Sequence, residues 1–381
     1  MTTFTDINRT AMQIEDIALT FIPRLGVRGA VHLLEEFGTA GAIFAAGADE
    51  LIGRASLRED VARRIASHDG FREAERELAY CEKHGIRPIA STDAEYPQMM
   101  LRGTADYPHV IYIQGDAAVL NRRMISIVGT RRCSAMSDAM CLRTVGELAE
   151  RIPDLTVVSG LAFGVDSQAH RAAVACGVPT VAVLPEVLPD VSPATHRALA
   201  DDILAHGGVL LSELNSATHR NPSLYLLQRN RIIAAMGEGL LVVESPLKGG
   251  SLVTAGIADS YHRTVMALPG RPSDSRSGGC NALIRRNVAV LVNSAGDIIE
   301  SLGWQTSPAW QTQSADAIDD VPLSGDEGRI AAVLGGGPLD PDTIAERGGM
   351  DIGTVLSTLM IMELGGAVRP LPGNLYELQR Q

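Results

Sequence analysis

The chain has 381 residues and a formal net charge of −12, with 45% hydrophobic but only 4% aromatic residues. Its length predicts two or three domains, and its acidity excludes a protein that is coated with nucleic acid over its whole surface. Five widely spaced cysteines without a CxxC pair exclude a zinc knuckle or a disulfide framework. The lack of a signal peptide or a membrane-length apolar run favours the cytoplasm.

Residues 1–75 show the apolar spacing of short helices, with the turn Ile-Pro-Arg-Leu-Gly at 22–26 between two of them. Helix-hairpin-helix modules use a similar layout to present backbone N–H groups to a phosphate, but Arg24 stands where they have their first glycine. A structural cap and a DNA contact are therefore both open for this domain. A connector at 76–123 follows and includes the strand-like run VIYIQGD.

Residues 124–302 alternate short apolar runs with helical patterns. The runs MISIVG, LTVVSG, PTVAVL, GVLLSE, GLLVVES and TVMALPG are bounded by Gly, Pro or Ser, as buried parallel strands are, and VAVLV adds a seventh. This βαβ series predicts an α/β fold with an extended, Rossmann-like, doubly wound sheet. A linker at 303–325 and a winged-helix-like domain at 326–381 complete the chain.

The predicted winged helix has the wrong charge for nucleic acid. Residues 301–381 contain four arginines and no lysine against eleven Asp and Glu residues. The predicted third helix, DIGTVLSTLMIMELGG, has neither Arg nor Lys, although DNA-reading winged helices use such residues on that helix. Because non-specific DNA binding is mostly electrostatic, this composition predicts protein docking or packing.

The loops that follow the predicted strands form the candidate site. Loops after parallel strands meet at one edge of the sheet, where ligands bind. These loops are rich in Gly and Ser and carry Arg131, Arg132 and Lys248. Glycine lets a phosphate approach bare N–H groups. Neither GxGxxG nor GxxxxGK[ST] is present, and VGTRR offers one glycine, Gly129, and then an arginine after Thr130. This pattern favours backbone phosphates over a buried pyrophosphate. No cofactor or metal is predicted.

The segment QRNRIIAAM, at 228–236, lies between two predicted strands and is predicted to begin a short helix. Arg229 and Arg231 are two positions apart and project in different directions, so one can face the groove while the other pairs within the protein. Asn230 can cap the helix or bond a loop. For each arginine, a salt bridge that orders the loop is the alternative interpretation.

Two patterns suggest an enzyme. Asp166 and His170 are spaced i, i+4 and could form an acid–base pair or bind metal, but an N-cap and a packed histidine explain them better. The GGSLVT loop is similar to the phosphate motif of nucleoside phosphoribohydrolases. The glutamate expected after its threonine is absent, and Glu244 is an imperfect substitute.

Six motifs in series resemble the DNA-processing protein A (DprA/Smf) family: SIVGTRR, VVSGLAFGVDSQAHRAAV, QRNRIIAAM, KGGSLVTAGIA, ALPG and GGCNALIRRN. The resemblance implies a SAM-like or helix-hairpin-helix-like N-terminal domain and a Rossmann-like core without established enzymatic activity. It also implies a homodimer that binds single-stranded DNA and loads RecA in natural transformation (competence) and homologous recombination.

The resemblance also assigns residues. Arg131 matches the family's phosphate-binding arginine, and Ser159 and Gly160 match its SG turn. The RNR motif falls on residues 229–231. The glycine-serine loop falls on Lys248, Gly249, Gly250 and Ser251.

Three departures bear on the site. Phe163 replaces a basic residue of the family and could stack on a base or fill core space. The family's phenylalanine before RNR is absent, and Tyr225 or Leu226 stands near its place. LPEVLPDVSP replaces a glycine-rich loop. We therefore expect a single-strand-binding recombination mediator. The alternatives are a nucleotide N-glycosidase-like enzyme and a protein-only scaffold.

Overall fold

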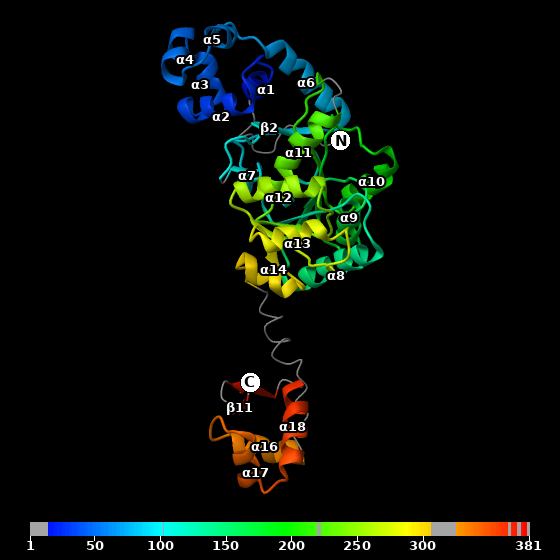
Figure 1. Ribbon diagram of the computed structural model, residues 1–381. Helices are drawn as coiled ribbons and strands as arrows, with labels where there is room; N and C mark the ends of the chain where they lie inside the picture. Colours follow the sequence, from blue (N-terminus) through cyan, green and yellow to red (C-terminus); the bar gives the residue numbers. More distant parts are fainter. Residues whose placement is uncertain are drawn as a thin grey trace, which may run out of the picture. The chain divides into compact units, whose positions relative to one another are not determined.

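The computed structural model describes residues 14–101, 103–218, 222–305, 325–364, 367–371 and 375–378 (Figure 1). Residues 306–324, most of the linker expected at 303–325, lie outside the described residues. The chain divides into two compact units, residues 1–306 and 307–381. No helix in the described ranges has the length and apolar character needed to cross a membrane.

The first unit begins with six helices that share a core of their own. Ile17, Leu33 and Ile43 are fully buried in this core, and each such side chain stabilises the fold by about 1.5–3 kcal/mol. The helices are α1 (Ile14–Thr20), α2 (Gly26–Phe37), α3 (Ala40–Ala45), α4 (Ala48–Ala55), α5 (Glu59–Ala66) and α6 (Phe71–His84).

A nine-stranded sheet forms the centre of the first unit, in the order β1-β2-β6-β5-β4-β3-β7-β8-β9. Strands β3 to β9 run parallel, as the βαβ pattern predicts. Two antiparallel strands from the connector, β1 and β2, extend this sheet beside β6. The strands are β1 (Arg87–Ala90), β2 (Val110–Gly115), β3 (Arg123–Val128), β4 (Leu155–Ser159), β5 (Thr180–Val183), β6 (Val209–Ser212), β7 (Gly239–Val242), β8 (Thr264–Ala267) and β9 (Val290–Leu291).

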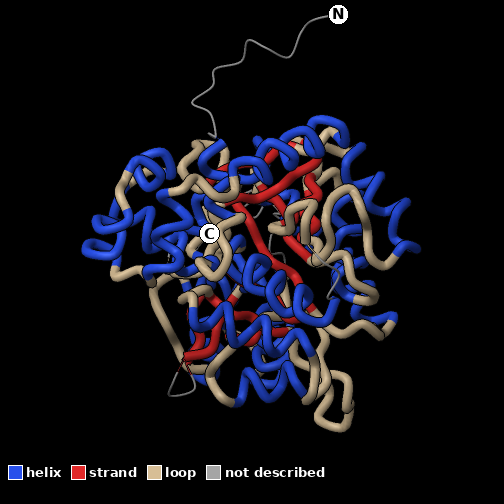
Figure 2. Tube along the Cα trace, turned by 90° about the horizontal axis from the view of Figure 1, so that it is seen from above, coloured by secondary structure: helices blue, strands red, loops and turns tan. Residues whose placement is uncertain are grey.

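Helices cover both faces of the sheet, so the strands run between two helical layers (Figure 2). Residues of α11, α12 and α13 pack on one face, and residues of α8, α9 and α14 pack on the other. The elements are α7 (Gln98–Leu101), η1 (Ala117–Asn121), α8 (Ala135–Arg151), α9 (Val165–Ala175), η2 (Ala194–His196), α10 (Arg197–Ala205), α11 (Pro222–Met236), α12 (Gly250–Ser260), α13 (Gly278–Arg285) and α14 (Ala295–Leu302). The expected doubly wound α/β class is confirmed.

Helix α11 corrects one prediction. It begins at Pro222, so Arg229, Asn230 and Arg231 lie within the helix and Asn230 is not its cap. Proline is favoured at the first position of a helix. The early part of α11 exposes Leu224 and Leu227, which breaks the apolar period by which an amphipathic helix is recognised.

The second unit has the predicted order of three helices and a strand pair. Buried Ile330, Ile344, Val355 and Leu359 form its core. Its elements are α16 (Asp326–Leu334), α17 (Pro341–Gly348), α18 (Ile352–Leu364), β10 (Val368–Leu371) and β11 (Leu375–Leu378). Strands β10 and β11 pair antiparallel as a wing.

Candidate nucleic-acid interface

A pocket of about 160 Å³ opens at the carboxyl edge of the sheet, among the loops that follow β3, β4 and β5. Sites for drug-sized ligands are mostly about 300–1,000 Å³, so this pocket fits one chemical group rather than a whole nucleotide. It is lined by Arg131, Gly160, Ala162, Phe163, Pro185, Glu186, Ser192, Pro193, Leu226 and Arg229. Four of the residues predicted from sequence therefore meet here: Arg131, Gly160, Phe163 and Arg229.

Close packing of glycines brings the first two loops together. A Cβ atom at Gly164, whose φ is +79°, would lie 2.2 Å from the Thr130 carbonyl oxygen. A Cβ atom at Gly129 would lie 2.5 Å from the Val165 side chain. Larger residues would force the loops apart, so these glycines place Arg131 beside the turn that carries Phe163.

Arg131 and Arg132 are exposed at the start of the β3–α8 loop. Within the described part of the chain, neither guanidinium makes an ion pair or a side-chain hydrogen bond. Arg131 lines the pocket, whereas Arg132 does not. An exposed guanidinium without a carboxylate partner is free to form a bidentate contact with a phosphate.

Arg229 also lines the pocket but has a different role. Its side chain is buried and donates hydrogen bonds to the Gly160 carbonyl and, at 2.8 Å, to the Val183 carbonyl. The Asp166 carboxylate, on the first turn of α9, accepts hydrogen bonds from the amides of Ala162 and Gly160. Burial raises the pKa of Asp166, and the Arg229 charge opposes that rise. Arg229 thus fixes the ends of β4 and β5.

The other predicted residues of α11, and Ser159 of the SG turn, do not line the pocket. Arg231 pairs with Glu213, and both side chains are nearly buried. Asn230 and Tyr225 are half-buried on α11, and it is Leu226 that lines the pocket. Ser159 is fully buried and donates from Oγ to the Ile127 carbonyl at 2.7 Å, so its hydroxyl supports the end of β4 and is not available to a ligand.

The glycine-serine loop before α12 does not line this pocket. Lys248 is exposed there, and Gly249 is the N-cap of α12 with Gly250 as its first residue. The Ser251 hydroxyl donates to Ser245 Oγ at 2.8 Å. This loop therefore offers a cation at a helix N-terminus as a separate anion contact on the same edge.

The residues proposed for catalysis have structural roles. Glu244 is buried and accepts hydrogen bonds from Ser134 N at 2.8 Å and Ser137 Oγ at 2.7 Å, at the start of α8. His170 is fully buried, and its Nδ1–H donates to Thr180 Oγ1 at 2.8 Å, because the Thr180 hydroxyl donates to the Val157 carbonyl. Burial lowers the pKa of His170 to about 3.

The expected N-cap role of Asp166 is also corrected. The N-cap of α9 is Gly164, and Asp166 lies within the first turn. Its acceptors are used by loop amides instead of the helix. Nowhere in the described ranges do three His, Cys, Asp or Glu side chains gather as metal ligands.

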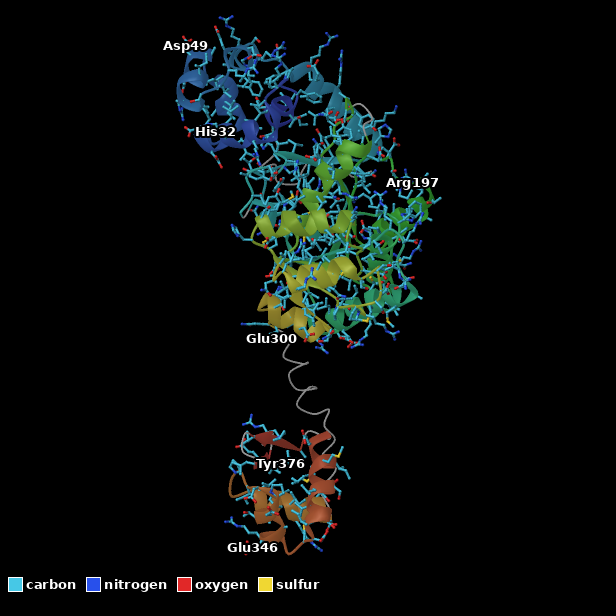
Figure 3. The ribbon with its side chains drawn as sticks, in the orientation of Figure 1. His32, Asp49, Arg197, Glu300, Glu346 and Tyr376 are labelled. Atoms are coloured by element: carbon cyan, nitrogen blue, oxygen red, sulfur yellow. The ribbon has the colours of Figure 1, made fainter. Side chains whose placement is uncertain are left out.

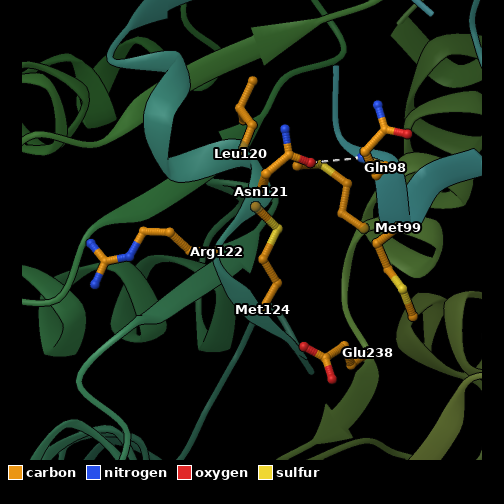
Figure 4. A pocket seen from close by; sticks show the side chains of 8 residues that line it. Gln98, Met99, Leu120, Asn121, Arg122, Met124 and Glu238 are labelled. Atoms are coloured by element: carbon orange, nitrogen blue, oxygen red, sulfur yellow. Dashed lines mark hydrogen bonds between the residues drawn. The ribbon is translucent and has the colours of Figure 1, made fainter. Parts of the chain in front are cut away.

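A second pocket, of about 240 Å³, lies at the amino edge of the sheet (Figure 4). Met99, Met124 and Glu238 line it, and Gln98 N donates to Asn121 Oδ1 at 2.9 Å beside it. It contains none of the predicted site residues. Ligands of doubly wound sheets bind at the carboxyl edge, so the first pocket is the better candidate.

One part of the pocket escaped the sequence reasoning. The walls formed by Pro185, Glu186, Ser192 and Pro193 come from a loop whose sequence has no phosphate-binding pattern. The N-terminal turn, by contrast, favours the structural interpretation that the sequence left open. Arg24 has a φ of +66° and its guanidinium pairs with Asp60 at 3.2 Å, which leaves no free cation at that turn.

Comparisons with known proteins agree with this architecture. The family described as DNA recombination-mediator protein A matches residues 87–303, and the DprA winged helix domain matches residues 314–374. Protein Smf of Escherichia coli is 33% identical over 309 residues, 80% of this chain and 81% of that protein. DNA processing protein DprA of Bacillus subtilis is 34% identical over 228 residues, 60% of this chain and 75% of that protein.

Solved structures are also similar to this chain. DNA processing protein A of Streptococcus pneumoniae superposes with a TM-score of 0.63 at 26% identity and covers 76% of this chain and 98% of its own. DNA processing protein A of Helicobacter pylori, described for its single-stranded DNA binding mode, has a TM-score of 0.50 at 26% identity. That match covers 57% of this chain and 95% of the other.

Proposed function

The chain belongs to the DNA recombination-mediator protein A family, also named DprA or Smf, and from this premise we propose that it binds single-stranded DNA along the carboxyl edge of its sheet. The Helicobacter pylori relative, described as binding single strands, supports the proposal. In this proposal residues 124–302 are the DNA-binding core, and the chain also has an N-terminal helical domain at 1–75 and a C-terminal domain at 326–381.

One observation carries the proposal: Arg131 is exposed at the carboxyl-edge pocket and makes no ion pair with any described residue, in a molecule whose net charge is −12. Arg131 holds a phosphate there. Ser159 and Gly160 shape the pocket instead of donating to the phosphate, because Ser159 is fully buried and the Gly160 amide is bonded to the Asp166 carboxylate. Lys248 and the amides of Gly249–Ser251 hold a second phosphate. Phosphate contacts carry no sequence information, so we expect low sequence specificity.

Arg229 and Arg231 have supporting roles in this proposal. Both guanidiniums are committed to partners within the protein, Arg229 to two carbonyls and Arg231 to Glu213. Replacing either leaves a buried group without its partner, which costs about 1–3 kcal/mol or more. Their loss therefore weakens DNA binding through the shape of the pocket. In this proposal Asn230 and Tyr225, on the same helix, lie next to the bound DNA strand.

Family membership extends the proposal to a cytoplasmic mediator that protects incoming DNA and helps load RecA during natural transformation and recombination. A homodimer is part of it. The outer strand β9 supports dimerisation, because its two residues, Val290 and Leu291, are 48% and 43% exposed. An apolar edge strand is a template for pairing with another chain.

The test compares a labelled single strand with the corresponding duplex by fluorescence anisotropy over a range of salt concentrations. We expect tighter binding of the single strand and a tenfold loss or more in Arg131→Ala, since a charge-assisted hydrogen bond contributes about 1.5–3 kcal/mol. Unchanged binding in Arg131→Ala, or a preference for duplex, would contradict the proposal.

No specific observation favours an N-glycosidase, because Glu244 is buried and accepts from the Ser134 amide and the Ser137 hydroxyl. Incubation with nucleoside monophosphates should therefore release no free base. Release that disappears in Glu244→Gln would replace the binding proposal with an enzymatic one. The RecA step is tested by recombinase filament formation on single strands covered by single-strand binding protein, with and without this chain.

A further inference from the structure

Phe163 is half-exposed at the mouth of the pocket, at 50% of its full accessibility. A phenylalanine that fills core space is buried, so this exposure excludes the packing role that the sequence left open. An exposed aromatic face next to a phosphate-binding cation is the pairing that single-strand-binding proteins use. Phe163 is therefore a surface ring at the pocket beside Arg131 and not a core residue.

The ring of Phe163 does not stand alone. It packs edge-to-face on His196, with ring centroids 4.8 Å apart and planes inclined by 66°. His196 is itself buried, and its Nδ1–H donates to the Leu161 carbonyl at 2.8 Å. One aromatic ring is thus held by a second, which is anchored to the backbone.

The anchor lies in a constrained turn. Leu161 has a φ of +52°, in the left-handed region that residues with side chains rarely adopt. It is fully buried, two positions before Phe163. The hydrogen bond from His196 supports the Leu161 carbonyl in this conformation, so His196 holds both the turn and the ring that the turn projects.

The surroundings of Phe163 suit a nucleobase. Ala162, Pro185, Pro193 and Leu226 add apolar walls to the pocket, and Arg131 lies among its lining residues. The volume, about 160 Å³, suits one group rather than a nucleotide. An unstacked base can lie against Phe163 while the neighbouring phosphate meets Arg131, an arrangement that a base paired inside a duplex cannot adopt.

We propose that Phe163 is a stacking platform for one base of the bound single strand and that His196 is the residue that positions it. The proposal rests on single-strand binding as the protein's function and adds the group that the pocket recognises. Every base has a π-face, so the platform distinguishes a base from no base and not one base from another.

The test uses two labelled strands of equal length: an oligothymidylate and a strand with abasic sites in place of the bases. We expect the full chain to prefer the oligothymidylate by about tenfold, which corresponds to about 1.4 kcal/mol. Phe163→Leu removes the ring but keeps an apolar side chain, and should abolish most of this preference. Phe163→Trp should keep it. Arg131→Ala should weaken both strands alike.

His196 is tested by the same ratio, because a folding defect lowers binding to both strands and leaves the preference unchanged. His196→Ala should reduce the preference as Phe163→Leu does, and the double variant should lose little more. If His196→Ala fails to fold, His196→Asn places an N–H donor for the Leu161 carbonyl where Nδ1–H lies, without the ring, and gives the same test.

The outcomes distinguish a failure of single-strand binding from a failure of the Phe163 platform. A wild-type chain that binds neither strand overturns the proposed function and this inference with it. Binding to the oligothymidylate with an unchanged preference in Phe163→Leu overturns the platform alone. Loss of preference in Phe163→Leu but not in His196→Ala overturns the positioning role of His196.

Discussion

The carboxyl edge of the sheet and the winged helix both belong to folds that bind nucleic acids in other proteins, but they present opposite charges. At the edge, Arg131, Arg132 and Lys248 are exposed. In the second unit, α18 has neither Arg nor Lys, and Glu346 projects from α17 (Figure 3). Arg369 of the wing is paired with Glu377 at 2.7 Å.

The contrast teaches that the distribution of unpaired charge, and not the class of fold, indicates where nucleic acid binds. The total charge of −12 hides this distribution, because the acid of the second unit outweighs a few free cations on the first. Experiments that treat one site on each unit in the same way test the contrast directly.

Charge reversal should have the largest effect. Arg131→Glu removes a phosphate contact and adds repulsion, so we expect single-strand affinity to fall about a hundredfold, or about 2.7 kcal/mol. Arg347→Glu makes the same change at an exposed residue of α17 and should alter affinity by less than about twofold. An equal loss of single-strand affinity in the two variants, measured by anisotropy, would contradict the proposed difference between the two units.

Overpacking the edge should come next. A Cβ atom at Gly160 would lie 1.7 Å from Arg229 Nη1, so Gly160→Ala should destabilise the first unit by about 1–3 kcal/mol. Gly256→Ala is the matched control, since that helical position has open space and alanine is the better helix former. Calorimetry should show the first unit's transition lowered by Gly160→Ala alone, with the second unit unaffected.

Lowering the pH should destabilise the first unit more than the second, by a smaller free energy than the substitutions above. All nine histidines lie in the first unit, and burial holds the pKa of His170 at about 3, below its ordinary 6.5. In this pH range His170 binds a proton in the unfolded chain but not in the folded chain, so the free energy of unfolding falls as the pH drops from 6.5 toward 3. The slope from this group is about 1.4 kcal/mol per pH unit.

Urea unfolding at pH 6.5 and pH 5 measures this loss. His170→Gln, which does not titrate, should flatten the slope in the first unit by about one proton. The second unit should hold its stability over this range, because it has no histidine and its carboxylates protonate at lower pH. A slope that is identical in wild type and His170→Gln would show that His170 does not control the acid response.

The smallest effect should come from adding charge to the winged helix. Leu356 and Met360 are 49% and 64% exposed on α18, and the double variant Leu356→Lys, Met360→Lys introduces two cations there. We expect a gain in single-strand affinity of only about twofold to threefold, because the surrounding carboxylates remain. A gain as large as the loss in Arg131→Glu would make the second unit a latent DNA site.

The sequence predicted much of this fold for clear physical reasons. Runs such as LTVVS in β4 are buried on both faces, and continuous apolar runs of that length between helical patterns indicate parallel strands. The start of α11 was wrong because Leu224 and Leu227 face outward. Local pattern cannot show where a surface leucine points.

At the site, sequence could predict which loops meet but not what each side chain does there. The strand order brings Gly160 and Arg131 to one edge, and this follows from the parallel pattern. Whether Arg229 faces DNA or the carbonyls of Gly160 and Val183 depends on contacts between residues far apart in the chain. His196 gave no signal, because its contact with Phe163 is a tertiary one.

The central claim is that free cations at the carboxyl edge neutralise the phosphates of a single strand. Its most direct measurement is the slope of log K against log salt for a single strand, in the wild type and in Arg131→Ala. The account predicts that the single strand binds more tightly than the duplex and that the slope becomes shallower by about 0.7, the value for one phosphate. A slope that does not change in Arg131→Ala, or tighter binding of the duplex, would contradict it.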